Sequence, residues 1–406
     1  MAPPRFLAFS GLVLALTVST FYPAHSSPST MGSRLQTLSP LALGFLLGLL
    51  VAETPLASAL QQLFGLTTRN PDKVGLDILH GGINSSSSSS GDDLADKKKA
   101  ELNQRTMYGL QHAFLNLEVT GWWFNMGLWD KVSDEKTLMD KEKTTPRFKA
   151  MRFQDACQAL VRKVTDGLDI SPKSHILDVG FGCGDQDVYM AQLYQPAQIT
   201  GITIEPIQHH AAEDLIRRTA TPGTKIDLHV ADASALPAFL ESNPEVLPNN
   251  QLFSHVISID SAYHYRTRAQ FLKNASKVLQ PGIGRLAMAD MILAKPVPTS
   301  FLGRKVFDAV FGAMEVPAVN MKSLEDYKKD LTEAGFVDIE IECIEDRVFP
   351  GLASFIENQL GRLGGLVKPG VHWTYWGLCK GLFWLDRSKW LHFVVVKARK
   401  GNSLSS

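Results

Sequence analysis

The chain has little cysteine and no excess of charge of either sign. Its four cysteines, spread over 406 residues, form no CxxC pair, which argues against a disulfide scaffold and a zinc ribbon. The 41 basic residues are balanced by 41 acidic ones, so we expect no nucleic-acid partner, which normally requires an excess of lysine and arginine. His, Asp and Glu residues show no spacing typical of a metal site, and we predict none. What remains is a neutral chain of enzyme size, with 45% hydrophobic residues.

Two apolar stretches open the sequence. Residues 6–22 precede the sequence PAHSS, a pattern typical of a signal-peptide core or of a short membrane anchor. The second stretch begins at Leu41 and is broken by Glu53 and Pro55, short of the ~20 apolar residues that a membrane span needs. A cleaved peptide and a buried helix stay open as alternatives, but we interpret residues 1–65 as membrane or targeting segments.

Basic residues and a serine run follow these stretches. Lysine and arginine are more frequent after the second stretch than between the two, and basic flanks tend to stay cytosolic. We therefore expect an intracellular membrane, that of the endoplasmic reticulum, with the catalytic domain facing the cytosol. The run Ser85–Ser90 lies among glycine, asparagine and aspartate, so residues 66–100 are predicted to form a flexible linker. A secreted binding protein is the alternative if the first stretch is cleaved.

Residues 101–147 are predicted to form a helical and aromatic cap, and residues 148–400 alternate between strand and helix patterns. The spacing of apolar residues predicts helices at 153–168, 186–194, 207–220, 268–279 and 323–335. Short apolar runs predict strands at 175–181, 198–204, 225–232, 255–261, 285–293, 336–344 and 391–399. This alternation predicts an α/β, Rossmann-like fold, with a seven-stranded, mostly parallel sheet and helices on both faces.

A glycine-rich turn joins the first predicted strand to the first helix. Gly180, Gly182 and Gly184 permit a sharp turn and let a ligand approach the backbone. A dinucleotide-binding fold needs G-x-G-x-x-G, whereas the spacing here is G-x-G-x-G and Asp178 precedes it on the strand. A carboxylate at that point repels a pyrophosphate and suits a cationic ligand. A nicotinamide-dependent oxidoreductase is therefore the weaker alternative.

At these residues the chain resembles the class I S-adenosylmethionine-dependent methyltransferases, whose DxGxGxG motif cradles S-adenosyl-L-methionine. The resemblance covers about residues 148–400. The segment from Gly201 is similar to the G-x-T-x-S-x-x-Q pattern of the tocopherol, sterol and cyclopropane-forming branch, which implies that Thr203 and Gln208 contact the cofactor. Glu205 stands where that pattern has serine and is a candidate for the ribose contact.

The resemblance extends to the end of the third predicted strand. Asp232, with Ala233 beside it, matches the acid that commonly receives the adenine amino group. The complete set of candidate cofactor-binding residues is Asp178, Gly180, Gly182, Gly184, Gln186, Thr203, Gln208, Asp232, Ala233 and Asp260.

The fourth predicted strand leads into a D-S-x-x-H stretch. This stretch resembles the branch of the family that methylates sugars, polyketides and quinones, as does the A-D stretch in the next strand, Ala289-Asp290. In that branch a histidine near this point, sometimes with the later aspartate, assists deprotonation of the acceptor. We therefore predict that His264 accepts a proton and that Asp290 orients or supports it. The alternative is that His264 only lines the pocket or hydrogen-bonds the backbone.

Two insertions, residues 295–321 and 349–389, are expected to act as lids. The second mixes aromatic and basic residues, which suits a membrane interface or a lid over an apolar substrate. We expect a membrane-associated enzyme that methylates a hydrophobic small molecule at a hydroxyl, such as a secondary metabolite, a lipid or a quinone-like acceptor. Carbon methylation of the sterol or tocopherol type, nitrogen methylation and a non-catalytic cofactor-binding subunit remain open, as does the oligomeric state.

Overall fold

The computed structural model describes residues 114–117, 121–132, 148–247, 251–299, 301, 304, 307–308, 311–312, 314–363 and 369–402. The predicted membrane segments 1–65 and linker 66–100 lie outside these residues, as does much of the cap predicted over 101–147. In the part of the chain that the structure describes, no helix combines the length and the apolar character needed to cross a membrane.

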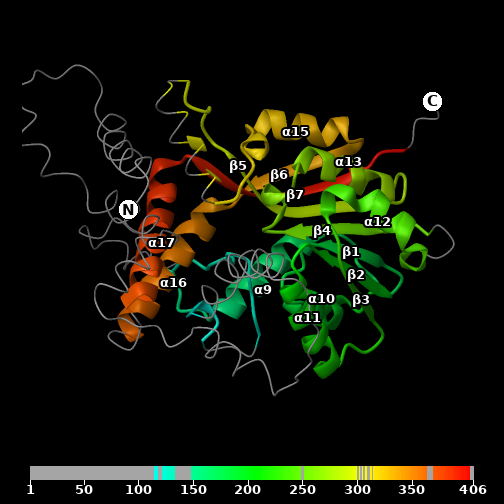
Figure 1. Cartoon of the computed structure of the whole chain (residues 1–406), viewed down its shortest axis with the longest axis horizontal. Coiled ribbons are helices and arrows are strands. Elements are labelled where there is room, and N and C mark those ends of the chain that lie inside the picture. The colour runs from blue at the N-terminus through cyan, green and yellow to red at the C-terminus, as the bar shows by residue number, and fades with distance from the viewer. Residues whose placement is uncertain are drawn as a thin grey trace, which may run out of the picture.

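A seven-stranded sheet forms the centre of the molecule (Figure 1). Its spatial order is β3-β2-β1-β4-β5-β7-β6, and β7 runs antiparallel to both of its neighbours. The central strands β1 and β4 are buried along their whole length, as expected of parallel strands covered on both faces. The predicted mostly parallel sheet is thus confirmed. Its strands are β1 (His175–Val179), β2 (Gln198–Thr203), β3 (Lys225–Val230), β4 (His255–Ile259), β5 (Arg285–Leu293), β6 (Phe336–Cys343) and β7 (Leu391–Lys400).

Helices cover both faces of this sheet. Leu160 and Val164 of α9 belong to the core on one face, and Phe271 of α13 and Leu331 of α15 belong to the core on the other. α9 ends just before Gly167, which takes a left-handed conformation that glycine tolerates. The helices are α9 (Phe153–Thr165), α10 (Asp185–Tyr194), α11 (Pro206–Arg218), α12 (Leu236–Ser242), α13 (Arg268–Val278) and α15 (Leu324–Glu333).

The second expected insertion folds into two long helices, α16 (Glu345–Leu363) and α17 (Pro369–Ser388). They pack side by side at one end of the molecule, and α16 also contacts β7 (Figure 1). Phe349, Ile356 and Cys379 are buried in the same core as α9, because each helix presents apolar side chains at helical spacing. The insertion therefore contributes to the hydrophobic core.

Candidate active site

The glycine turn connects β1 to α10 and has a left-handed backbone at each glycine. Gly182 has a φ of +64°, and a Cβ built there meets nothing closer than Phe124, at 3.6 Å. Gly180 is different, because its Cβ would lie 2.3 Å from Oγ of Ser261. Gly180 thus lets the segment after β4 pack against the turn, while Gly182 is required by backbone conformation alone. The structure brings the predicted motif to the carboxyl end of β1, where open α/β sheets bind ligands.

Two buried carboxyl groups lie directly under this turn. Nε2 of Gln186 donates a 2.6 Å hydrogen bond to Oδ2 of Asp178, so two predicted residues are in contact. Burial raises the pKa of Asp178 to about 6. Burial and the neighbouring charge of Asp178 raise the pKa of Asp187 well above its usual value. Neither carboxyl is paired with a basic side chain in the described part of the chain.

Two further carboxylates bind the backbone of the aromatic segment 121–132 and hold it close to the glycine turn. The backbone N–H of Trp122 donates to Oδ2 of Asp185 at 3.0 Å, and that of Met126 donates to Oδ2 of Asp260 at 2.7 Å. Burial raises the pKa of both carboxyls to about 6. The same segment buries Trp129 in the core, so it both covers the turn and packs against the sheet.

The next candidates lie at the carboxyl ends of β2 and β3. Oγ1 of Thr203 donates to Oε1 of Gln208 at 3.1 Å and also accepts from the backbone N–H of Glu205. Asp232 is exposed, and its carboxylate accepts a 2.7 Å hydrogen bond from the backbone N–H of Ser234. The neighbouring Ala233 is buried. The structure therefore gathers these residues along the edge that also carries the glycine turn.

Two apolar residues at this edge are unexpectedly exposed. Ile204 follows β2 and is 62% exposed, and Val230 ends β3 and is 48% exposed. Thr203 and Val230 are register partners, so both apolar side chains stand at the ends of adjacent strands. Each exposes apolar surface at the edge of the sheet that carries the glycine turn.

His264 lies in the short helix η6 (Ala262–His264), which follows β4. Its ring is half-buried, and Nδ1 lies 3.3 Å from the carbonyl oxygen of Glu315. A carbonyl can only accept, so Nδ1 carries the proton and Nε2 is left as the acceptor nitrogen. Burial lowers the pKa of His264, and this effect outweighs the Glu315 carbonyl, which acts in the opposite direction. The imidazole is therefore neutral near pH 7.

Asp290, predicted to orient or support His264, hydrogen-bonds other groups. Its buried carboxylate accepts hydrogen bonds from Nη1 of Arg268 at 3.0 Å and from Oη of Tyr327 at 2.7 Å. Its other oxygen accepts from the backbone N–H of Met291. Because Arg268 and Tyr327 take up this carboxylate, Asp290 makes no hydrogen bond with His264 among the described residues.

Asp290 nevertheless reaches η6 through a chain of hydrogen bonds. Arg268 also donates to the carbonyl of Asn320, and Nδ2 of Asn320 donates to the carbonyls of Tyr263 and Tyr265 on either side of His264. Asp290 is thus connected to η6 through Arg268 and Asn320.

Sequence reasoning missed several residues of this site. Asp185 and Asp187 flank Gln186, and two acids immediately after the last glycine were an available signal for them. Glu315 contacts His264 through its backbone carbonyl, and a backbone contact of this kind leaves no sequence signal.

The chain is similar in sequence to known methyltransferases. A family model described as a methyltransferase domain matches residues 176–282. The chain is 33% identical over 199 residues to the erythromycin 3''-O-methyltransferase of Saccharopolyspora erythraea, a match that spans 48% of this chain and 61% of that enzyme. It is 31% identical over 258 residues to an O-methyltransferase of Aspergillus sclerotiorum, which covers 63% of this chain and 84% of that protein.

A solved structure shares the fold. It is the geranyl diphosphate C-methyltransferase of Streptomyces coelicolor, crystallised with geranyl-S-thiolodiphosphate, a magnesium ion and S-adenosyl-L-homocysteine. The TM-score is 0.51 at 15% identity, and the alignment covers 71% of this chain and 92% of that one.

Proposed function

Because the chain belongs to the class I S-adenosylmethionine-dependent small-molecule methyltransferases, we propose that it transfers a methyl group to a hydroxyl of a lipophilic small molecule. The observation that carries the proposal is the group of buried carboxyls at the glycine turn, which has no basic partner among the described residues. Hydroxyl as the acceptor group is supported by the two O-methyltransferase relatives.

The residues at the turn fit S-adenosyl-L-methionine. When bound, this cofactor supplies a methyl group on a positively charged sulfonium, already activated for displacement. Asp178, Asp185 and Asp260 are acids whose ionised forms are disfavoured by burial, and a cation beside them offsets that cost. Val230, two residues before Asp232, provides exposed apolar surface for the adenine ring.

The remaining chemistry is alignment and proton removal. Positioning of two reactants can contribute ~7–11 kcal/mol, whereas a general base contributes ~10²–10⁴-fold in rate. We therefore assign most of the rate enhancement to the elements that hold the acceptor in line. His264 accepts the hydroxyl proton on Nε2, held in place by the Glu315 carbonyl and by the network through Asn320.

We propose that the enzyme is bound to the membrane of the endoplasmic reticulum, with its catalytic domain facing the cytosol. The apolar stretches before residue 65 support this setting. Trp373 and Leu378 of α17, which are 54% and 43% exposed, also support it. Lys380 lies on the same helix, and aromatic residues next to lysine suit an interface with lipid headgroups.

Incubation of the purified full chain with methyl-labelled donor and fractionated lipid extract tests the proposal. The expected result is a labelled methyl ether identified by mass, with much less product from His264→Ala and full product from His210→Ala, whose exposed imidazole lies on α11. A labelled carbon- or nitrogen-methyl product would contradict hydroxyl methylation. Donor binding without transfer to any fraction would instead favour a non-catalytic cofactor-binding subunit.

A further inference from the structure

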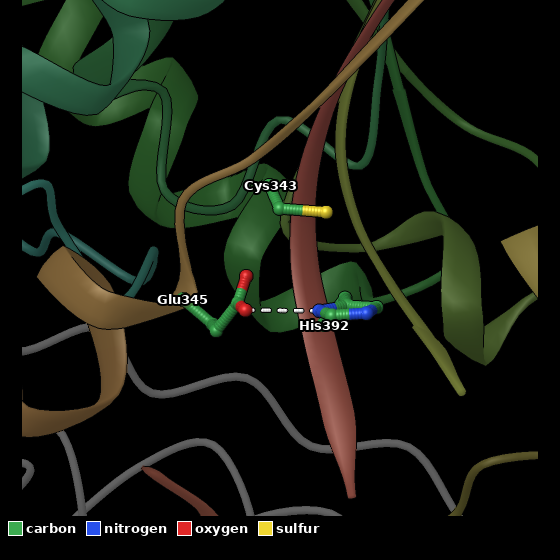
Figure 2. Close-up of side chains that lie close together, drawn as sticks. All are labelled: Cys343, Glu345 and His392. Atoms are coloured by element: carbon green, nitrogen blue, oxygen red, sulfur yellow. Dashed lines mark hydrogen bonds and ion pairs between the residues drawn. The ribbon is translucent and has the colours of Figure 1, made fainter. Parts of the chain in front are cut away.

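Three side chains capable of binding a metal meet at the edge of the sheet, outside the site described above. Cys343 ends β6, Glu345 begins α16 and His392 is the second residue of β7 (Figure 2). One ligand atom from each residue lies within 4.8 Å of the other two. Cys343 pairs with Val394, so Cys343 and His392 are diagonal neighbours on one face of the antiparallel β6–β7 pair. The separation of 47 residues between Glu345 and His392 hides this cluster in the sequence.

The carboxylate of Glu345 is only partly satisfied by its surroundings. Its Oε1 lies 2.9 Å from Nδ1 of His392, the contact drawn as a dashed line in Figure 2. Its Oε2 is buried and has no hydrogen-bond partner among the described residues. A buried carboxylate oxygen without a partner is costly, and a bound cation is one way to satisfy it.

Cys343 stands apart from the other cysteines. All four cysteines of the chain lie in the described ranges, and Cys343 alone is exposed. The acidic side chains of Glu345 and Glu342 act on its thiol, and their negative charge attracts a cation.

We propose that Cys343, Glu345 and His392 bind a zinc-type divalent ion, with a water molecule in the fourth position. Thiolate, imidazole and carboxylate are the donors that Zn²⁺ takes in proteins, whereas Mg²⁺ and Ca²⁺ prefer oxygen donors throughout. Tetrahedral bonds of about 2.0–2.3 Å place ligand atoms about 3.5 Å apart, a spacing within the 4.8 Å limit that the three ligand atoms meet. Small side-chain rotations can bring the three groups to that geometry, since Cys343 is exposed and His392 is half-buried.

The position of the site suggests what the ion does. Cys343 and Glu345 lie just before and at the start of α16, and His392 lies shortly after the end of α17. The three ligands therefore bracket the α16–α17 insertion at both of its junctions with the sheet. A bound ion ties these junctions together and stabilises the packing of the two helices against β7.

Titration of the metal-free full chain with Co²⁺, a spectroscopic substitute for Zn²⁺, tests the site. We expect one equivalent to bind with a thiolate-to-cobalt charge-transfer band that added Zn²⁺ removes. Cys343→Ser abolishes the band, and Glu345→Gln and His392→Ala weaken binding at least tenfold. His210→Ala is the matched control, because it removes a histidine that lies near a carboxylate elsewhere in the chain: Nε2 of His210 is 3.9 Å from Oδ2 of Asp214 on α11. This variant should leave the titration unchanged. A wild-type titration without the band, or a band that persists in Cys343→Ser, would overturn the proposal.

Thermal unfolding gives a second readout that does not depend on activity. A ligand that binds only the folded state raises the melting temperature with its concentration. Zn²⁺ should therefore raise the melting temperature of the wild type and of His210→Ala, but not that of Cys343→Ser. Cleavage of the α16–α17 insertion by a protease should slow in parallel. Equal shifts in the wild type and in Cys343→Ser would place the ion elsewhere and refute the assignment.

Discussion

Replacement of Asp178 by Asn separates two effects of the buried carboxylate. The substitution keeps the shape of the side chain and lets its amide oxygen accept from Gln186. It removes the negative charge that we assign to the recognition of a cationic cofactor. We therefore expect cofactor affinity and the stability of the cofactor-free protein to move in opposite directions.

The magnitudes follow from burial. Loss of one partner of a buried charge pair costs about 2–5 kcal/mol, so the affinity for S-adenosyl-L-methionine should fall at least about 30-fold. A pKa raised from 3.8 to about 6 corresponds to about 3 kcal/mol of unfavourable ionisation in the folded state. Because the folded pKa lies above the unfolded value, this cost appears as pH rises from about 4 to 6 and persists above. At pH 7.5 the cofactor-free variant should thus gain up to about 3 kcal/mol of stability.

Isothermal titration calorimetry and urea unfolding measure the two quantities. Wild-type affinity should weaken below pH 6, where Asp178, Asp185 and Asp260 take up protons, and this pH dependence should be smaller in Asp178→Asn. Asp169→Asn, a change at an exposed carboxylate, is the control and should alter neither quantity. Wild-type affinity in Asp178→Asn would refute the assigned role of this charge.

Three further predictions test other parts of the site. His264→Ala should lower kcat about 10²–10⁴-fold while calorimetry shows unchanged cofactor binding, and near-normal turnover would remove His264 from the mechanism. Arg268→Ala leaves Asp290 buried without its cation and should destabilise the fold by about 3–5 kcal/mol in urea unfolding; a loss below 1 kcal/mol would contradict the buried ion pair. Gly182→Ala forces a non-glycine residue to a φ of +64°, so cofactor affinity should drop while the fold, followed by circular dichroism, persists; unchanged affinity would count against the turn as the binding loop.

The central strands were predictable because they are buried on both faces. Apolar runs such as those of β1 and β4 have no polar face, and each is bounded by turn residues. The glycine turn was predictable for a related reason, since its function depends on residue types at fixed local spacing. The helices α16 and α17 were not predicted, because their mixture of aromatic and basic residues obscured the helical period.

Contacts between distant segments could not be predicted from the sequence. Asp260 accepts from the backbone of Met126, 134 positions earlier, and a backbone donor of this kind leaves no sequence signal. The resemblance implied that Asp290 orients or supports His264, but its carboxylate hydrogen-bonds Arg268 and Tyr327 and is linked to η6 only through other residues. The metal-ligand cluster at Cys343 was missed for the same reason, because strand pairing brings its members together.

Calorimetry on the full chain with three ligands tests most directly whether the glycine turn recognises a sulfonium cofactor. S-adenosyl-L-methionine and S-adenosyl-L-homocysteine should each bind at one molecule per chain, and a nicotinamide dinucleotide should give no heat. Clear binding of the nicotinamide dinucleotide, with no response to either sulfur compound, would contradict the assignment of the turn and of the proposed reaction.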